Sequence, residues 1–125
     1  MKRARKNLGQ RGEDLAAAQL EKRGYVVRER NWRCPAGEMD IVAEDGDCLT
    51  FVEVRTRRGR DYGTPEESVT LAKQAKLMEV AQTYLQEHSW EGDWRIDLVA
   101  VEMTPEGKLL RVELIKNAVT GSGVP

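Results

Sequence analysis

Residues 37–57, with the sequence GEMDIVAEDGDCLTFVEVRTR, decide the fold of this 125-residue chain. Two short runs of apolar residues flank the dipeptide Asp45-Gly46 within this stretch. Both residues tolerate a positive φ, which the central positions of a tight hairpin turn require. The stretch therefore predicts a β-hairpin with arms at residues 38–44 and 47–56.

The register of this hairpin decides which charged residues share a face, because side chains alternate between the two faces of a strand. With the turn placed as above, Asp40 lies opposite Phe51 and diagonal to Glu53. Glu38 and Arg55 then lie on the same face as these two carboxylates. Three neighbouring carboxylates repel one another, so we expect a cation among them. Arg55 can supply it, and so can Mg²⁺, which binds one or two carboxylates together with waters and substrate phosphates.

The composition sets limits on the class of protein. The chain has the length of one domain, spanning residues 1–125, and its charged residues (33%) cancel to a net charge of −1. Any nucleic-acid contact must therefore be local. No stretch resembles a membrane span or a signal peptide, and two cysteines with one histidine predict neither a disulfide framework nor a zinc site. We expect a cytoplasmic protein without a membrane partner.

The remaining elements follow from hydrophobic periodicity and from helix-capping residues. A helix over residues 12–23 ends before a glycine, and it carries Glu13 in its first turn beside an apolar stripe. Strands are predicted at residues 25–33, 94–102 and 108–116, and a long helix over residues 71–88 begins after Thr70. The strand–helix–strand connection implies a parallel strand pair. Residues 1–8 are predicted to form a loose basic arm, and residues 117–125 a loose tail.

Cationic residues gather near the hairpin and predict where an anion would bind. Arg33 ends a basic strand that contains a tryptophan, and the loop after the hairpin carries three further arginines. Arginine binds phosphate through paired donors and stacks on rings, although a charged edge strand is an alternative reading of the first group. The predicted nucleic-acid contacts are Arg33, Arg57, Arg58, Arg60 and, in the long helix, Lys73.

Asp97 lies inside the apolar run of residues 94–102 and needs a partner there. Arg95 or a backbone donor can provide it. We interpret Asp97 as a structural hydrogen-bonding residue.

The order of these motifs resembles that of a known superfamily. Asp40, twelve intervening residues and then Glu53-Val54-Arg55 resemble the acidic signature of the PD-(D/E)xK nucleases. The whole chain is similar to the YraN family of bacterial proteins, which is described as related to archaeal Holliday junction resolvases. The resemblance implies an α/β, restriction-endonuclease-like core with a mixed central sheet flanked by helices, in the order α-β-β-β-α-β-β. It rests on Gly9, Gly12-Glu13, Ala16, Gly24-Tyr25, Arg30-Asn31-Trp32-Arg33, residues 37–42, residues 51–57 and residues 95–99.

The resemblance also implies a catalytic site. Glu13, Asp40 and Glu53 would hold Mg²⁺ or Mn²⁺, with the Val54 carbonyl as a further ligand. Arg55 stands where the motif has a lysine that orients or deprotonates the attacking water. Arginine can neutralise developing charge, but with a pKa above ~12 it cannot act as a general base.

Three functions are compatible with this reading. The first is a metal-dependent endonuclease that acts on DNA, and in particular on branched DNA, with Lys73 compensating for the missing motif lysine. The second is a nuclease-fold protein that binds DNA or another partner without cleaving it. The third is a protein unrelated to nucleic acid, whose hairpin carboxylates are simply solvated beside a surface ion pair of Glu53 with Arg55. Related resolvases act as dimers, so the resemblance also implies a homodimer.

Overall fold

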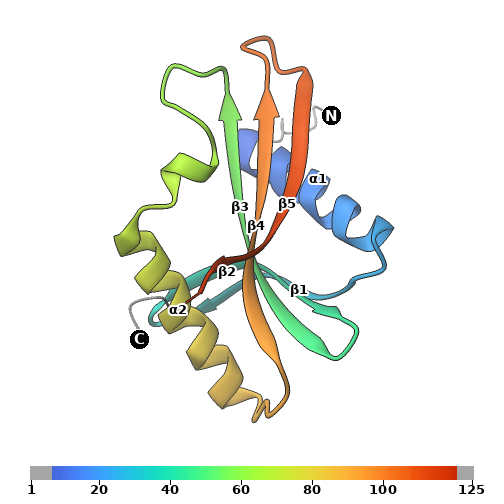
Figure 1. Cartoon of the computed structure of the whole chain (residues 1–125), viewed down its shortest axis with the longest axis vertical. Helices are drawn as coiled ribbons and strands as arrows, with labels where there is room; N and C mark the ends of the chain where they lie inside the picture. Colours follow the sequence, from blue (N-terminus) through green and yellow to red (C-terminus); the bar gives the residue numbers. More distant parts are fainter. Residues whose placement is uncertain (1–6, 121–125) are drawn as a thin grey trace, which may run out of the picture.

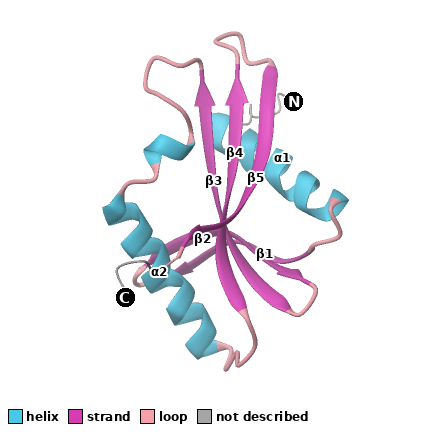
Figure 2. Ribbon diagram, in the orientation of Figure 1, coloured by secondary structure: helices cyan, strands magenta, loops and turns pink. Residues whose placement is uncertain are grey.

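A computed structural model describes residues 7–120 and gives two helices and five strands in these residues. The five strands form one mixed sheet in the order β1-β2-β3-β4-β5, in which β3 and β4 run parallel and the other neighbours are antiparallel. Figures 1 and 2 show α1 and α2 on opposite sides of this twisted sheet. The fold is the predicted α/β, restriction-endonuclease-like core. In chain order the elements are α1 (Leu8–Lys22), β1 (Val26–Cys34), β2 (Gly37–Asp45), β3 (Cys48–Arg58), the short 3₁₀ helix η1 (Glu66–Ser68), α2 (Leu71–Glu87), β4 (Trp94–Met103) and β5 (Leu109–Val119).

Each helix covers one face of the sheet, so the central strands are apolar on both sides. Ala16 and Leu20 of α1 pack with Val52 of β3 in one core layer. Val80 and Tyr84 of α2 pack in the other. A sheet buried on both faces leaves few places where charged side chains reach solvent, and these places define the possible sites.

The helix α1 crosses β3 at very close range. A Cβ atom added at Gly12 would overlap the Oγ1 atom of Thr56, so only glycine permits this crossing. The contact fixes the residues that flank Gly12, including Glu13, relative to β3.

The hairpin forms where predicted, but its predicted register is wrong. Asp45 pairs with Cys48 and Val42 with Phe51, so the turn consists of Gly46 and Asp47. Asp45 stays in the strand because its carboxylate binds Arg95 (2.8 Å). The shift amounts to two positions, and a shift of two keeps every side chain on its face. Asp40 and Glu53 therefore still share a face, as expected.

Several predicted boundaries also need correction. Asn7 caps α1 by accepting a hydrogen bond from the Gln10 amide (2.8 Å), so the helix begins at Leu8 and Glu13 lies beyond its first turn. The helix dipole at the first turn therefore does not explain Glu13. Strand β5 continues to Val119, so residues 117–119 belong to the sheet and not to a loose tail. The predicted basic arm falls mostly on residues 1–6, outside the described residues, and Leu8 is helical.

The expected structural role of Asp97 is confirmed. Asp97 is fully buried, where it accepts hydrogen bonds from the Nε atom of Arg95 (3.0 Å) and from the Asn117 amide (2.8 Å). None of the described helices combines the length and apolar character needed to cross a membrane.

The close crossing of α1 over β3 can be tested by substitution. Gly12→Ala is expected to lower the free energy of unfolding by about 1–3 kcal/mol, because overpacking forces the two elements apart. Gly9→Ala is the matched control, since the nearest atom to its added Cβ is 3.6 Å away and alanine favours the helix. Urea denaturation measures both. Equal stability of the two variants would contradict the proposed constraint.

Candidate active site

A cleft of about 570 Å³ lies where α1, the hairpin and the start of α2 meet. It brings together all four residues of the predicted catalytic set, from three separate elements. Four carboxylates and four cationic side chains line it. They are Glu13, Glu38, Asp40, Glu53, Arg55, Arg57, Lys73 and Lys76.

Asp40 lies where β2 separates from β3. The β2–β3 ladder ends at the pair Ile41–Val52, whereas β2 continues to pair with β1. Beyond that point the Oδ2 atom of Asp40 accepts a hydrogen bond from the Val54 amide (2.8 Å). The carboxylate thus takes the place of a strand partner and is held beside Glu53.

Glu53 is a buried carboxylate in the middle of the central strand, with 5% of its surface exposed. Burial, followed by the neighbouring charge and hydrogen bond of Asp40, raises the pKa of Glu53 to about 7, although Lys73 and Arg55 oppose the shift. The Oε2 atom of Glu53 lies 3.4 Å from Nζ of Lys73 and 3.2 Å from Nε of Arg55. The protein therefore brings two cations to the carboxylate, and these only partly offset its burial.

Glu13 reaches the cleft from α1. Burial and then the charge of Asp40 raise the pKa of Glu13, while a hydrogen bond with Asn31 and the charge of Arg30 lower it. Asp40 thus interacts electrostatically with both other carboxylates of the predicted set. Asn31 has a positive φ of 55°.

Two arginines of the cleft have unused donors. The Nε atoms of Arg55 and Arg57 are buried and have no hydrogen-bond partner among the described residues. Arg55 Nε is close enough to Glu53 for an ion pair, but it is not aligned for a hydrogen bond. Buried donors are almost always satisfied in proteins, so these two guanidinium groups retain hydrogen-bonding capacity at the cleft.

The carboxylates of the cleft could supply some, but not all, of the oxygen ligands of a divalent cation. Within residues 7–120, no three Asp, Glu, His or Cys side chains come close enough to form a metal site on their own. Asp40 and Glu53 do form a coupled pair of oxygen donors beside an open cleft. Mg²⁺ commonly needs only one or two protein carboxylates and completes its shell with waters and substrate phosphates. The chemistry of this pair therefore fits Mg²⁺ or Mn²⁺, and Glu13 lines the same cleft.

The structure separates the predicted nucleic-acid contacts from one another. Arg57 and Lys73 line the cleft, whereas Arg58 lies outside it at the exposed end of β3. Arg33 is 78% exposed in its side chain and pairs with Glu38 (3.0 Å). Arg60 lies against Glu102 of β4, and Arg60 is not among the residues that line the cleft. The expected cluster is therefore not continuous.

Sequence reasoning placed Glu38 on the face of Asp40 and Glu53, and Glu38 lines the cleft, but it missed Lys76 as a cation of this cleft. Lys76 follows Lys73 by three positions in α2, so the two lysines lie on the same side of the helix. This spacing in the sequence could have predicted that Lys76 accompanies Lys73 in the cleft.

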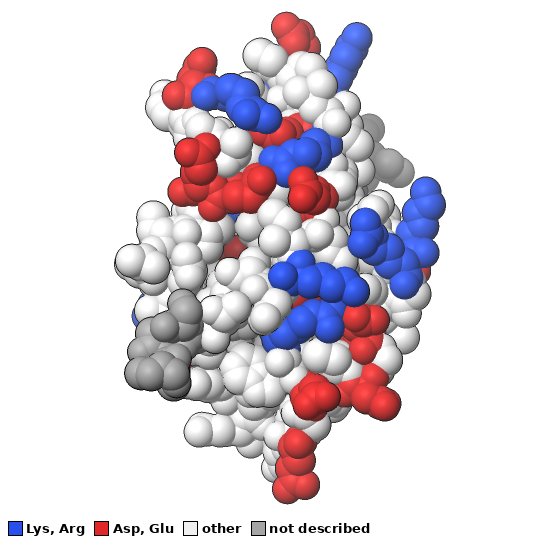
Figure 3. All heavy atoms as spheres, viewed as in Figure 1, with Lys and Arg blue, Asp and Glu red and all other residues white. Residues whose placement is uncertain are grey.

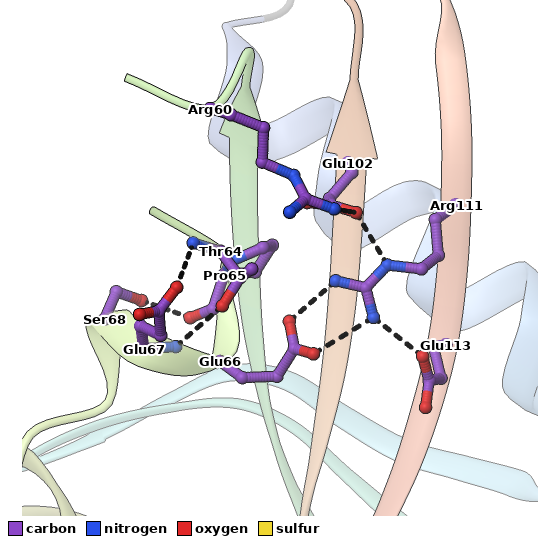
Figure 4. Close-up of polar contacts among 9 residues, drawn as sticks. All are labelled: Arg60, Thr64, Pro65, Glu66, Glu67, Ser68, Glu102, Arg111 and Glu113. Atoms are coloured by element: carbon purple, nitrogen blue, oxygen red, sulfur yellow. Dashed lines mark hydrogen bonds and ion pairs between the residues drawn. The ribbon is translucent and has the colours of Figure 1, made fainter. Parts of the chain in front are cut away.

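Arg60 belongs to a network that ties the β3–α2 connection to the sheet (Figure 4). Its Nε atom lies 2.6 Å from Glu102, which also binds Nε of Arg111 at 2.7 Å. Arg111 further binds Glu66 of η1 (2.7 Å) and Glu113 of β5 (2.7 Å). These contacts anchor the segment just before α2 and thereby help to position Lys73. Figure 3 shows acidic and basic side chains interspersed on this face, with no continuous basic surface.

Fold and site together define a small α/β protein of the restriction-endonuclease-like class with a cleft lined by carboxylates and cations. The chain belongs to the Uncharacterised protein family UPF0102, the YraN family, whose model matches residues 12–101. It is 51% identical over 118 residues to a UPF0102 protein of Roseiflexus castenholzii, covering 92% of this chain and 94% of the relative. A UPF0102 protein of Dehalococcoides mccartyi is 50% identical over 117 residues, with 92% and 94% covered. One of Moorella thermoacetica is 44% identical over 119 residues, with 94% and 99% covered.

The electrostatics of the cleft predict a pH dependence of stability. The pKa of Glu53 is about 7 in the folded protein against an ordinary 4.5, so between these values the folded state holds the proton more tightly than the unfolded state. In the presence of a chelator, the free energy of unfolding should therefore fall as the pH rises from about 5 to 8. In the Glu53→Gln variant this fall should be smaller by about 1–3 kcal/mol.

Urea denaturation at several pH values measures this effect. The control is Glu106→Gln, which changes an exposed carboxylate with no ion pair among residues 7–120. Identical pH profiles for the two variants would show that Glu53 is not held at a raised pKa.

Proposed function

We propose that this protein binds DNA in the cleft and cleaves it as a divalent-metal-dependent endonuclease. The observation that carries the proposal is the convergence of Glu13, Asp40 and Glu53 with Arg55 and Lys73 in one cleft. The same residues hold the positions at which the chain resembles the PD-(D/E)xK nucleases. Membership in UPF0102 supports the resemblance without assigning an activity.

The residues of the cleft divide into an acidic centre and cationic walls. Asp40 and Glu53 would hold Mg²⁺ or Mn²⁺, with Glu13 beside them. When bound, such an ion polarises a phosphate and lowers the pKa of a bound water. The guanidinium groups of Arg55 and Arg57 line the cleft and are suited to the oxygens of a phosphodiester, since arginine forms strong charge-assisted hydrogen bonds with phosphate.

Lys73 takes over part of the role of the missing motif lysine. Arg55 cannot remove a proton from water, because the guanidinium stays charged. Lys73 enters the cleft from α2 and contacts the Oε2 atom of Glu53, so it places a compact ammonium group at the acidic centre. There it neutralises Glu53 and stabilises negative charge on the substrate.

A second function, DNA binding without cleavage, is favoured by one observation. Arg55 and Lys73 already neutralise Glu53, which weakens its attraction for a metal ion. Under either function the proposed partner is DNA. The resemblance to resolvases further suggests that the DNA is branched, that the protein acts as a homodimer and that it acts in the cytoplasm.

Metal binding tests the acidic centre first. Asp40→Asn combined with Glu53→Gln should abolish Mn²⁺ binding, because both carboxylate ligands become neutral. Isothermal titration calorimetry measures the affinity for Mn²⁺. Glu38→Gln is the control, since Glu38 lines the same cleft but pairs with Arg33. Unchanged Mn²⁺ affinity in the double variant would exclude the pair as ligands.

Cleavage of labelled branched and linear DNA in Mg²⁺ or Mn²⁺ separates the two functions. Wild-type cleavage that Asp40→Asn abolishes supports the endonuclease, whereas binding without cleavage supports the alternative. Arg55→Lys should raise the cleavage rate by about 10²-fold with little change in DNA affinity, the size of a general acid–base contribution. A neutral or lower rate would mean that Arg55 acts only as an electrostatic clamp.

A further inference from the structure

Two arginines converge outside the cleft, at the turn between β4 and β5. Arg11 of α1 donates a hydrogen bond from Nη2 to the Gly107 carbonyl (3.2 Å). A Cβ atom added at Gly107 would lie 3.5 Å from Nη1 of Arg11 and 3.5 Å from Nη2 of Arg58. The two guanidinium groups are therefore neighbours, although one comes from α1 and the other from the end of β3.

Neither guanidinium has a counter-ion among residues 7–120. Within residues 7–120 no carboxylate forms an ion pair with Arg11 or Arg58, in contrast to Arg33 and Arg60, which bind Glu38 and Glu102. Glu106 is exposed beside Gly107 but forms no ion pair with either arginine. Like charges at short range repel one another, so an anion that contacts both groups would stabilise this arrangement.

The backbone holds both arginines in place. Arg58 follows Thr56 by two positions on the same face of β3, and Arg11 directly precedes Gly12 in α1. The close contact of Gly12 with Thr56 thus fixes both side chains at their origin. Gly107 has a φ of 89° and no side chain, which leaves room between the two groups.

The position of the pair relative to the cleft suggests what binds there. Arg11 and Glu13 flank Gly12, and residues two apart in a helix point to nearly opposite sides. Glu13 faces the cleft, so Arg11 and Arg58 lie across the first turns of α1 from it. A helix is about 10–12 Å wide, which corresponds to roughly three nucleotides of a strand that rises 3.4 Å per nucleotide.

We infer that Arg11 and Arg58 form a phosphate-binding site that holds the DNA backbone a few nucleotides from the cleft. Two guanidinium groups offer paired donors that match phosphate oxygens, and the phosphate supplies the missing negative charge. This inference rests on the proposed function, because it takes the ligand in the cleft to be the same DNA. It adds a second contact, which would set the direction of the strand.

The salt dependence of DNA binding tests this site without requiring cleavage. The variant Arg11→Gln with Arg58→Gln should lower the log–log slope of affinity against salt by about one unit, and affinity at low salt by about tenfold, for one lost phosphate contact. The matched control is Lys22→Gln with Arg23→Gln, the same charge change at the opposite, exposed end of α1. Fluorescence anisotropy of labelled DNA in chelator measures both. Equal slopes for the two double variants would overturn the site.

Thermal unfolding separates a binding role from a structural one. Arg58→Gln alone keeps the bond from Arg11 to Gly107 and should leave the melting temperature unchanged while weakening DNA binding. Unchanged DNA binding by this variant would overturn the role of Arg58.

A failure of the proposed function has a different signature. If the wild type binds no DNA at low salt, titration with inorganic phosphate, followed by the Nε–H resonances of the arginines, decides the site separately. Phosphate-dependent shifts at Arg11 and Arg58, absent for Arg23, would support the anion site while excluding DNA as its ligand. No shifts would overturn the site as well.

Discussion

The hydrogen bond from the Val54 amide to the Asp40 carboxylate is the contact on which the rest of the site depends. It forms where β2 leaves β3, so the amide keeps a partner after the ladder has ended. The same bond places a carboxylate beside Glu53, which is already buried in the central strand. The need to satisfy a backbone donor thus adds the charge of Asp40 to the burial that already raises the pKa of Glu53.

A cation that opposes this shift comes from another element, α2. Lys73 lies in its first turn, where the helix dipole disfavours a cation, and its amide is capped by Thr70. The contact with Glu53 offsets this unfavourable position. Because Arg111 and Glu66 hold the segment before α2 against the sheet, the network in Figure 4 supports the cleft from a distance.

The arginines divide into two groups that look alike in the sequence. Arg33 and Arg60 are neutralised by carboxylates of the protein, and this pairing reduces their attraction for an external anion. Arg57 and Arg58 have no such partners among the described residues, and neither has Arg11. The proposed contacts with DNA therefore depend on the absence of an internal counter-ion and not on the number of arginines.

The sequence by itself determined the hairpin, the parallel crossover and the shared face of Asp40 and Glu53. These features depend on local periodicity, and a period of two tolerates the observed shift of the register. Tertiary structure alone decided the register, since Asp45 is kept in β2 by Arg95, which is distant in sequence. It also decided which cations form ion pairs with Glu53, and it brought the guanidinium groups of Arg11 and Arg58 close together. Such contacts depend on how helices cross strands, and local sequence patterns do not encode those crossings.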